Sequence, residues 1–571
     1  MLNRRDLLLL GGGLTAAGLA GPRWVAAESG DDPGPYRRAF ESLDAFITQY
    51  LADLGAPGLT LALADLGGVR RVATYGVGDL ARQSVLRSEQ LFEIGSITKS
   101  CVALALLELV DEGKLDLKRP IASYLPWLRF ESPFAPITVH DLMTHGAGLP
   151  DGPLFPPDPQ FRHVPRNAPG QDFHYCNMGW EALGHLLALL DGRPMAESLR
   201  ARIFAPLGMS DAEPVITFDM SRRMVTSYVA EQGDRPYPRR ARLAEAPGLV
   251  MTNGAGSIAA TPRDMGRYAQ MLARKGATTH GRLVSEAAFA LFSTPHIVAA
   301  EFGEGAHYGY GICVDHLDGH RRLRHTGGMV SFASALEIDL DEGLGVFASV
   351  NAMQGVRPRP VAEYALRLMR ACRNGAPLPP VPPADDPRRV ARAADYAGRF
   401  AGEGGRALEF EAAGERLSLV HRGERVPLEP AVGIADAFHV QHADFAHYLL
   451  LFTRADAADP KSAVLEAGYA ADWYVRPEYP GPRAFSTPPE WSAFAGHYRS
   501  EDPWIGSTRI ALRRGRLWLG GVVPLEAAPG GLFYLADEPR NPEWVRFFDI
   551  AGGRAMRMVF SGASLARVEA P

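Results

Sequence analysis

Ser96-Ile97-Thr98-Lys99 stands at the start of a strongly apolar segment of this 571-residue chain. A lysine three residues after a serine lies one helical turn further on, on the same face. An ε-amine held neutral there could take the hydroxyl proton and make Ser96 a nucleophile. Only Lys99, of five lysines, has a serine at this spacing. The four residues also allow another interpretation, in which Ser96 caps a helix and Lys99 is solvated.

The segment that follows predicts a buried helix. Cys101 to Val110 is apolar except for Glu108, and the run ends at Gly113. A helix without a polar face belongs in the centre of a domain, and this one is too short to span a bilayer. Burial here would lower the pKa of Lys99 from about 10.4 toward the ~7–8 that a general base needs.

The surrounding residues, 30–370, predict an α+β domain. Tyr36 to Leu54 has helical apolar spacing, and Gly58 to Gly76 has the pattern of two strands joined at Gly67-Gly68. Thr261-Pro262-Arg263-Asp264 has the features of a helix start. Residues 308–350 resemble an antiparallel meander. Strands at both ends and helices between them predict one antiparallel sheet built from both termini of the domain.

A second architecture follows a proline-rich linker at residues 377–387. Beyond it the helix signals end and short alternating strands recur. Tyr396-Ala397-Gly398-Arg399-Phe400 is repeated as Phe494-Ala495-Gly496-His497-Tyr498. We therefore expect two β-barrel modules, at 388–480 and 488–571. One larger irregular sandwich is the alternative.

The first 27 residues predict a twin-arginine signal peptide, and hence a periplasmic or secreted protein. Arg4-Arg5 precedes an apolar stretch from Leu7 to Ala20, and Val25-Ala26-Ala27 offers a cleavage site before Glu28. The alternative is a short amphipathic anchor or an uncleaved span. No other stretch is long enough to span a membrane, so none is expected after removal of the signal.

Composition narrows the possible partners. Net charge is −5, with 46% apolar and 22% charged residues, and basic pairs are isolated, so no nucleic-acid partner is expected. The four cysteines are widely spaced without a C-x-x-C motif, so we expect no metal and no disulfide scaffold, although one bridge stays possible. No cofactor is predicted, and the oligomeric state is left open.

Tyr175-Cys176-Asn177 is the second candidate element, at the end of a proline-rich loop and the start of a predicted helix. A phenol there could pass a proton between the serine and a leaving group, and the amide could hydrogen-bond Lys99 or the substrate. A buried tyrosine beside an asparagine helix cap is the alternative.

The third candidate element is His325-Thr326-Gly327-Gly328, within the predicted meander. Two glycines on a strand allow another backbone to approach closely, so this edge could bind an extended acyl group and supply one oxyanion donor. A bulge or turn is the alternative. Ser349-Val350-Asn351 competes with Tyr175-Cys176-Asn177, but it follows the His-Thr-Gly-Gly element and is therefore set aside.

Ser-x-x-Lys, Tyr-x-Asn and His-Thr-Gly in this order resemble the serine β-lactamase and penicillin-recognising family. The resemblance is strongest to its class C-like branch, with D-aminopeptidases, DD-peptidases and esterases, and covers roughly residues 38–360. The flanking sequences agree with this family, as in Phe92-Glu93-Ile94-Gly95-Ser96 and Ile203-Phe204-Ala205-Pro206-Leu207-Gly208-Met209. The resemblance implies a β-lactamase/transpeptidase-like domain at 28–376. The tail is similar in layout to D-aminopeptidases with two lipocalin-like barrels.

The resemblance also implies roles. Ser96 forms an acyl-enzyme, Lys99 and Tyr175 share the acid–base work, and Asn177 orients Lys99 and the substrate. The backbone N–H groups of Ser96 and Gly328 form the oxyanion hole. Which of Lys99 and Tyr175 takes the first proton stays open.

One departure from the family pattern bears on the substrate, which we expect to be a small molecule or a peptide. Most β-lactamases and DD-peptidases have lysine where this chain has His325, and a neutral imidazole would bind a substrate carboxylate less well. A D-aminopeptidase, amidase or esterase is therefore expected. A β-lactamase or DD-carboxypeptidase is the alternative, and a non-catalytic binding or sensor protein is an alternative of another class.

Overall fold

The computed structural model describes residues 25–28, 34–128, 130–157, 161–353, 357–383, 386–536 and 540–569. Most of the predicted signal peptide therefore lies outside the described residues. No described helix combines the length and the apolar character needed to cross a membrane. All four cysteines lie in described segments and are free, so the single bridge left open by the sequence is not formed.

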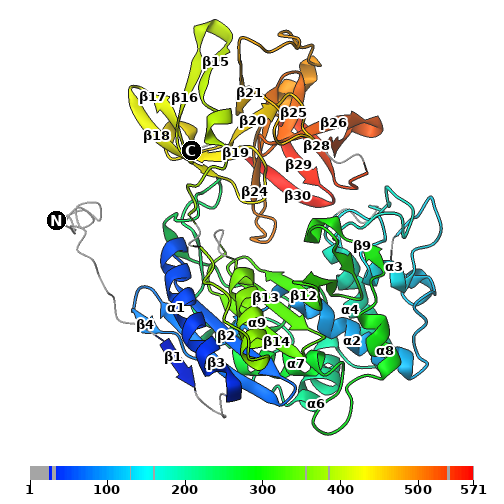
Figure 1. The fold of residues 1–571 in the computed structure, drawn as a ribbon. Coiled ribbons are helices and arrows are strands. Elements are labelled where there is room, and N and C mark those ends of the chain that lie inside the picture. The colour runs from blue at the N-terminus through cyan, green and yellow to red at the C-terminus, as the bar shows by residue number, and fades with distance from the viewer. Residues whose placement is uncertain are drawn as a thin grey trace, which may run out of the picture.

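The N-terminal domain is built on one antiparallel sheet (Figure 1). Its order is β1-β3-β2-β14-β13-β12-β11-β10-β9, with β4 beside β3. The strands are β1 (Val25–Glu28), β2 (Gly58–Asp65), β3 (Gly68–Asp79), β4 (Ser84–Val85), β9 (Ile297–Val298), β10 (His307–Tyr308), β11 (Cys313–Leu317), β12 (His320–Gly328), β13 (Ala333–Asp339) and β14 (Leu344–Val350). The β2–β14 pairing confirms that both ends of the domain build the sheet.

Helices cover both faces of this sheet. On one face α1 (Arg37–Leu54) packs with α9 (Arg359–Arg373) in a shared apolar cluster with the strands. On the other face α7 (Pro262–Ala273) contacts β2, β3 and β14. The sequence did not predict α9, so the expectation that the domain ends in strands is wrong.

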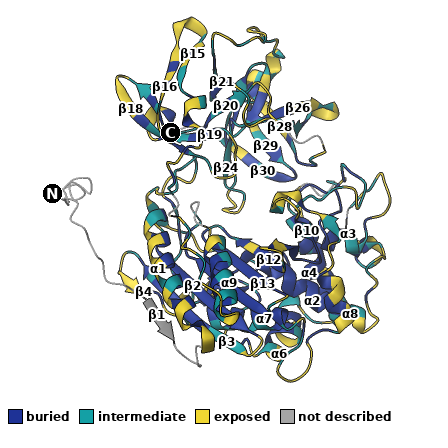
Figure 2. Cartoon of the chain, in the orientation of Figure 1, coloured by how far each residue is buried: buried dark blue, intermediate teal, exposed yellow. Residues whose placement is uncertain are grey.

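The helical region contains the serine. It consists of α2 (Thr98–Asp111), α3 (Val139–Met143), α4 (Asn177–Asp191), α5 (Met195–Leu199), α6 (Ala205–Leu207) and α8 (Glu286–Phe292), with the short pairs β5 (Phe92–Glu93) with β8 (Ala259–Ala260) and β6 (Tyr228–Ala230) with β7 (Leu243–Glu245). Helix α2 is buried on every side from Thr98 to Leu107 (Figure 2), as its lack of a polar face predicted.

Two closed barrels of eight strands follow, which excludes the single-sandwich alternative. The first contains β15 (Gly398–Gly402), β16 (Ala407–Ala413), β17 (Arg416–His421), β18 (Glu424–Pro430), β19 (Ala437–Val440), β20 (Leu450–Arg454), β21 (Val464–Tyr469) and β22 (Asp472–Val475). The second contains β23 (Gly496–Arg499), β24 (Ser507–Arg513), β25 (Arg516–Leu519), β26 (Val523–Ala528), β27 (Leu532–Leu535), β28 (Trp544–Ala551), β29 (Arg554–Phe560) and β30 (Ala563–Val568).

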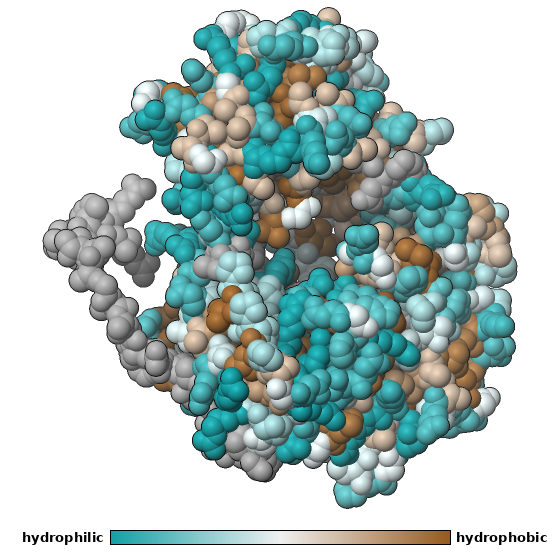
Figure 3. Space-filling view, in the orientation of Figure 1, coloured by the Kyte–Doolittle hydropathy of each residue, from teal (hydrophilic) through white to brown (hydrophobic). Residues whose placement is uncertain are grey.

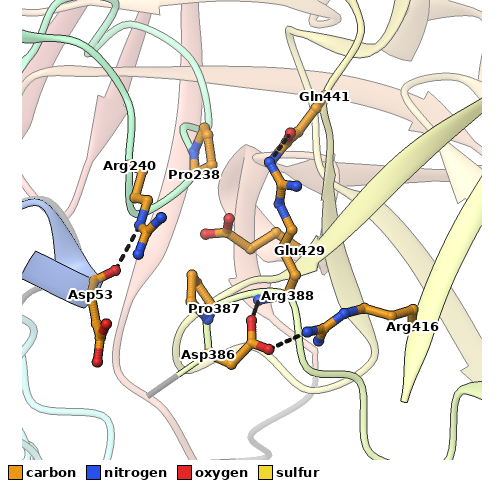
Figure 4. Close-up of a pocket in the computed structure, with 9 residues that line it drawn as sticks. All are labelled: Asp53, Pro238, Arg240, Asp386, Pro387, Arg388, Arg416, Glu429 and Gln441. Atoms are coloured by element: carbon orange, nitrogen blue, oxygen red, sulfur yellow. Dashed lines mark hydrogen bonds and ion pairs between the residues drawn. The ribbon is translucent and has the colours of Figure 1, made fainter. Parts of the chain in front are cut away.

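Both barrels lie on the same side of the N-terminal domain (Figure 1). Figure 3 shows a hollow between the barrels and that domain. At one junction, a cavity of about 660 Å³ separates the end of α1 from the linker and the first barrel (Figure 4). There Arg416 pairs with Asp386, and Arg388 donates to Gln441 at 3.0 Å. The linker is thereby fixed to the first barrel.

Candidate active site

Ser96 lies at the turn that leads into α2. Gly95, at φ +54°, begins a 3₁₀ turn (Gly95–Ile97) that continues into the helix, and neither N-cap position of these helices makes a side-chain capping hydrogen bond. The Ser96 hydroxyl instead lies 2.9 Å from Lys99 Nζ. The capping interpretation is therefore wrong.

Lys99 is fully buried and has three oxygen neighbours. Its Nζ lies 2.9 Å from Ser96 Oγ, 2.7 Å from Asn177 Oδ1 and 2.8 Å from the Ala255 carbonyl oxygen. A neutral amine has two N–H donors and one lone pair. Because the amide and carbonyl oxygens can only accept, they take both protons, and the lone pair is directed at the Ser96 hydroxyl. This is the arrangement that a general base requires.

Electrostatics favour that neutral amine. Burial lowers the pKa of Lys99 from 10.5 to about 7, although the nearby Asp151, Cys176 and Glu181 act in the opposite direction. Desolvation is the larger effect because the helix around Lys99 is apolar on every side. The uncharged amine is therefore accessible near neutral pH, which it would not be for a solvated lysine.

Tyr175 lies across from both groups. The neighbouring Ser96 hydroxyl acts on its pKa, and Lys99 Nζ lies 4.9 Å from the centre of its ring. The ring also stacks on that of His145, with centroids 4.2 Å apart. Burial raises the pKa of Tyr175 well above its ordinary value. The phenol therefore stays protonated at neutral pH and acts as a donor.

Asn177 is held by a carboxylate that the sequence did not single out. Asp151 accepts the Asn177 backbone N–H at 2.6 Å through Oδ1 and its side-chain amide at 2.8 Å through Oδ2. Oδ1 also lies 3.3 Å from the backbone nitrogen of Met178, so Asp151 satisfies donors at the start of α4. The amide oxygen of Asn177 is thereby turned toward Lys99.

His325 is buried among aromatic rings. Its Nδ1 lies 2.7 Å from the Thr326 carbonyl oxygen, which can only accept, so Nδ1 carries the proton. Its Nε2 therefore accepts from the Tyr308 hydroxyl at 2.8 Å. Burial, aided by the Lys99 charge, lowers the pKa of His325 to about 3. The imidazole is neutral, and both of its nitrogens are occupied within the protein.

The glycines after His325 allow two backbones to meet. A Cβ on Gly327 would lie 1.9 Å from the Ile94 carbonyl oxygen, so no larger residue fits there. This contact brings Gly328 beside the turn that contains Ser96, and both residues line one pocket. Thr326, two residues before Gly328, is exposed and does not line that pocket.

The pocket has a volume of about 420 Å³ and includes part of the second barrel. Its lining residues are Ser96, Phe155, Asn177, Glu181, His185, Leu249, Val250, Met251, Thr252, Asn253, Ala255, Gly256, Gly328, Asp502 and Trp504. Asp502 and Trp504 belong to the loop between β23 and β24. Among the described residues, this lining includes carboxyl groups and neither arginine nor lysine.

Comparison with known proteins agrees with this geometry. The Beta-lactamase family model matches residues 43–371. The chain belongs to the beta-lactamase family. It is thus placed among the beta-lactamase-related serine hydrolases, and the expected fold is confirmed.

Three proteins that resemble this beta-lactamase family member share about a quarter of its residues or fewer over the aligned regions. The chain is 26% identical over 249 residues to the D-alanyl-D-alanine-carboxypeptidase/endopeptidase AmpH of Escherichia coli K12, covering 41% of this chain and 61% of AmpH. It is 24% identical over 359 residues to the D-aminopeptidase of Brucella ovis, covering 60% of this chain and 64% of the relative. The octameric penicillin-binding protein homologue from Pyrococcus abyssi shares the fold, with a TM-score of 0.53, 22% identity and coverage of 76% of this chain and 100% of that one.

Other chemical candidates lie outside the Ser96 pocket. Ser349 is buried in β14 against Ser334, and the Asn351 amide donates to the Thr226 carbonyl at 2.9 Å. Both side chains therefore make hydrogen bonds within the protein interior, and neither lines the Ser96 pocket. Among the described residues, two clusters could hold a metal ion, and neither includes a residue that lines the pocket. They are His421, His442 and Asp444, and His320, Asp339 and Asp341.

Proposed function

We propose that this protein hydrolyses amides through an acyl-enzyme on Ser96, and that its substrates carry a free amino group, as D-aminoacyl amides and peptides do. The observation that carries the proposal is the charge of the pocket beside Ser96. Glu181 and the exposed Asp502 contribute carboxyl groups to its lining, which contains no arginine or lysine among the described residues. Burial raises the pKa of Glu181 to about 7, so this group becomes fully charged only above neutral pH or beside an ammonium ion. An ammonium group of a substrate therefore finds partners there, whereas a carboxylate does not.

The acid–base groups take distinct roles in the first step. Lys99 Nζ removes the Ser96 proton, and Oγ attacks the carbonyl carbon. As the C–N bond breaks, the Tyr175 phenol gives its proton to the leaving nitrogen and recovers one from the Lys99 ammonium. Lys99 is the first proton acceptor because its pKa is about 7, whereas that of Tyr175 is raised and the phenol starts out protonated.

The remaining steps use the same residues. The backbone N–H groups of Ser96 and Gly328 stabilise the oxyanion, and the close approach of Gly327 to Ile94 holds them together. Water activated by Lys99 and Tyr175 then attacks the acyl carbon and releases Ser96.

The same pocket argues against the alternative functions. A β-lactam or a D-alanyl-D-alanine terminus presents a carboxylate. His325 offers it neither a charge nor a free nitrogen, since Tyr308 and Thr326 occupy the ring. The D-aminopeptidase relative is consistent with the proposed class, and AmpH represents the alternative. Hydrolysis of D-aminoacyl amides, short-chain esters and nitrocefin should be compared, and preference for nitrocefin would overturn the proposal.

The rate should depend on pH through Lys99. With a short-chain ester that does not titrate, kcat/KM is expected to fall about tenfold per pH unit below an apparent pKa of about 7, because protonated Lys99 is not a base. Tyr175 adds no loss in this range, since its pKa is raised. A plateau that begins only near pH 10 would show that Lys99 is solvated and charged in the working enzyme.

Asp502 gives a direct test of amine recognition. Asp502→Asn is expected to raise KM for a D-aminoacyl amide about tenfold, because one charge-assisted contact is lost. KM for an ester without an amino group should not change. Glu501→Gln is the matched control, since Glu501 is the exposed neighbour that does not line the pocket. Equal effects on both substrates would exclude a role in amine binding.

We also propose export by the twin-arginine route, supported by Arg4-Arg5 and the apolar stretch that follows. Cleavage after Ala27 would remove all of β1 except Glu28, and β1 pairs with β3 at the edge of the sheet. N-terminal sequencing of the protein recovered from the periplasm tests this. A mature protein that keeps residues 1–27 would contradict it.

A further inference from the structure

A buried carboxylate of the second barrel contacts the loop that leads to the catalytic residues. Glu543, just before β28, is 8% exposed. Its Oε1 accepts the backbone N–H of Asp151 at 2.7 Å and the Nε2–H of His174 at 2.8 Å. Its Oε2 accepts the Ser561 hydroxyl. Both oxygens are therefore used, and one of them joins two segments of the active-site loop.

Both of these segments lead on to the reacting groups. Asp151 binds both the backbone and the side-chain amide of Asn177, and Asn177 Oδ1 accepts from Lys99 Nζ at 2.7 Å. His174 directly precedes Tyr175, and its backbone N–H donates to the His145 carbonyl at 2.9 Å. Glu543 thus lies three contacts from Lys99, through Asp151 and Asn177, and its partner His174 adjoins Tyr175 in the chain.

The barrel surface is fitted closely to this loop. A Cβ on Gly152 would lie 1.8 Å from the Ser561 carbonyl oxygen. The Asn167 amide donates to the Arg540 carbonyl at 2.7 Å, and the rings of Phe161 and Trp544 stack at 5.8 Å. Because these contacts already hold the barrel against the loop, Glu543 is not needed merely to dock it.

Charge also favours a specific role for this carboxylate. Burial lowers the pKa of His174, but the hydrogen bond and the charge of Glu543 more than offset this and the net pKa is raised. Glu543 and Asp151 are both acidic, and the charge of Glu543 adds to burial in raising the pKa of Asp151. Two buried carboxylates close together are costly. The hydrogen bonds that Glu543 and Asp151 accept offset this cost, and they are the contacts that fix the active-site loop.

We propose that Glu543 is a positioning residue for the catalytic site, holding Asp151 and His174 so that Asn177 and Tyr175 face Lys99 and Ser96. The second barrel is then an integral part of the active site. This inference rests on the proposed function, because it assigns the hydrogen-bond chain to the orientation of the base.

Variants of Glu543 in the full-length protein test it. Glu543→Ala is expected to lower kcat roughly 10- to 100-fold, because a small misplacement of the base is costly, while KM changes less than about threefold. Glu543→Gln keeps an acceptor oxygen in the same place and should retain most of kcat. Glu543→Asp keeps the charge but retracts the carboxylate by one methylene, so its kcat should lie below that of the glutamine variant.

Two matched controls separate positioning from docking. Arg540→Ala removes the ion pair with Asp172 at the same interface but outside this chain of contacts, and Glu526→Ala removes an exposed carboxylate of the same barrel. Both should leave kcat unchanged. Wild-type kinetics in the alanine variant, an aspartate variant more active than the glutamine variant, or equal losses in Arg540→Ala would each overturn the proposal.

The experiment also distinguishes the two levels of inference. If the wild-type protein hydrolyses no amide or ester and Ser96 stays unlabelled by a fluorophosphonate probe, the proposed function fails. If the wild-type protein is active and Glu543→Ala matches it, only the role of Glu543 fails. Should the alanine variant not fold, the order of the glutamine and aspartate variants still decides the question.

Discussion

Replacing Ser96 with alanine is expected to reduce hydrolysis by roughly 10⁴- to 10⁶-fold, to the level left by binding and the oxyanion donors. Oγ is the atom that forms the acyl bond, and no neighbouring side chain can substitute for it. Lys99 keeps two of its three oxygen neighbours in this variant, the Asn177 amide and the Ala255 carbonyl. The site should therefore stay assembled without its nucleophile.

Folding should be almost unaffected by the same change. Ser96 makes no capping hydrogen bond, so its loss should alter the free energy of unfolding by no more than about 1 kcal/mol. Activity, fluorophosphonate labelling and the melting temperature measured on one preparation would check this. Ser84→Ala, at an exposed serine, is the control. Retained turnover would exclude Ser96 as nucleophile, and a large drop in melting temperature would restore its structural interpretation.

The sequence predicts the contact between Ser96 and Lys99 well because their spacing is local. Ser96 and Lys99 are one helical turn apart, so secondary structure alone brings them together. Tyr175 and Asn177 come from another helix start, and only their order relative to the serine and to His325 indicated that they would meet. The structure places all of these residues in one neighbourhood, and it leaves the Thr326 side chain outside the pocket.

The supporting residues could not be predicted in the same way. Glu543 reaches Asp151 across 392 residues, through the docking of one domain on another, and no periodic pattern marks such a contact. Asp502 and Trp504 line the pocket for the same reason. His325 has a neutral ring because Tyr308 and the burial of the site fix it, whereas its residue type alone indicated only an ordinary imidazole.

Helix α9 was missed for a different reason, although its pattern is present in the sequence. Its buried residues Val361, Ala362, Ala365, Leu366 and Met369 recur at helical spacing, so the signal was present. Pro358 and Pro360 stand at its start and make the segment resemble a continuation of the loop. Proline is tolerated in the first turn, where its missing N–H has no helical partner to lose.

Lys99→Met should separate the catalytic and the energetic consequences of burying this amine. Without the base, kcat/KM is expected to fall roughly 10²- to 10⁴-fold. The free energy of unfolding should instead be higher in this variant at neutral pH. The reason is that the folded wild-type protein lowers the pKa of Lys99 to about 7, whereas the pKa in the unfolded chain is 10.5. Below pH 7 the folded protein bears the full cost of a buried ammonium.

The sign of the pH dependence follows from proton counts. Between pH 7 and 10 the unfolded chain binds more protons at Lys99 than the folded chain, so the wild-type free energy of unfolding rises with pH. From pH 7 to 9 the rise due to Lys99 is about 2–3 kcal/mol, and the methionine variant lacks it. The stability of the variant relative to wild type is therefore greatest below pH 7, and it declines by that amount between pH 7 and pH 9.

Denaturant unfolding of both full-length proteins at pH 7, 8 and 9 measures this difference. Subtracting the two curves cancels the titration of buried groups on which Lys99 does not act, such as Glu337, whose raised pKa is common to both proteins. Lys118→Met, at an exposed lysine, should show no pH-dependent difference from wild type. If Lys99→Met and wild type differ by the same amount at every pH, Lys99 is charged in the folded protein, and the proposed base is lost with it.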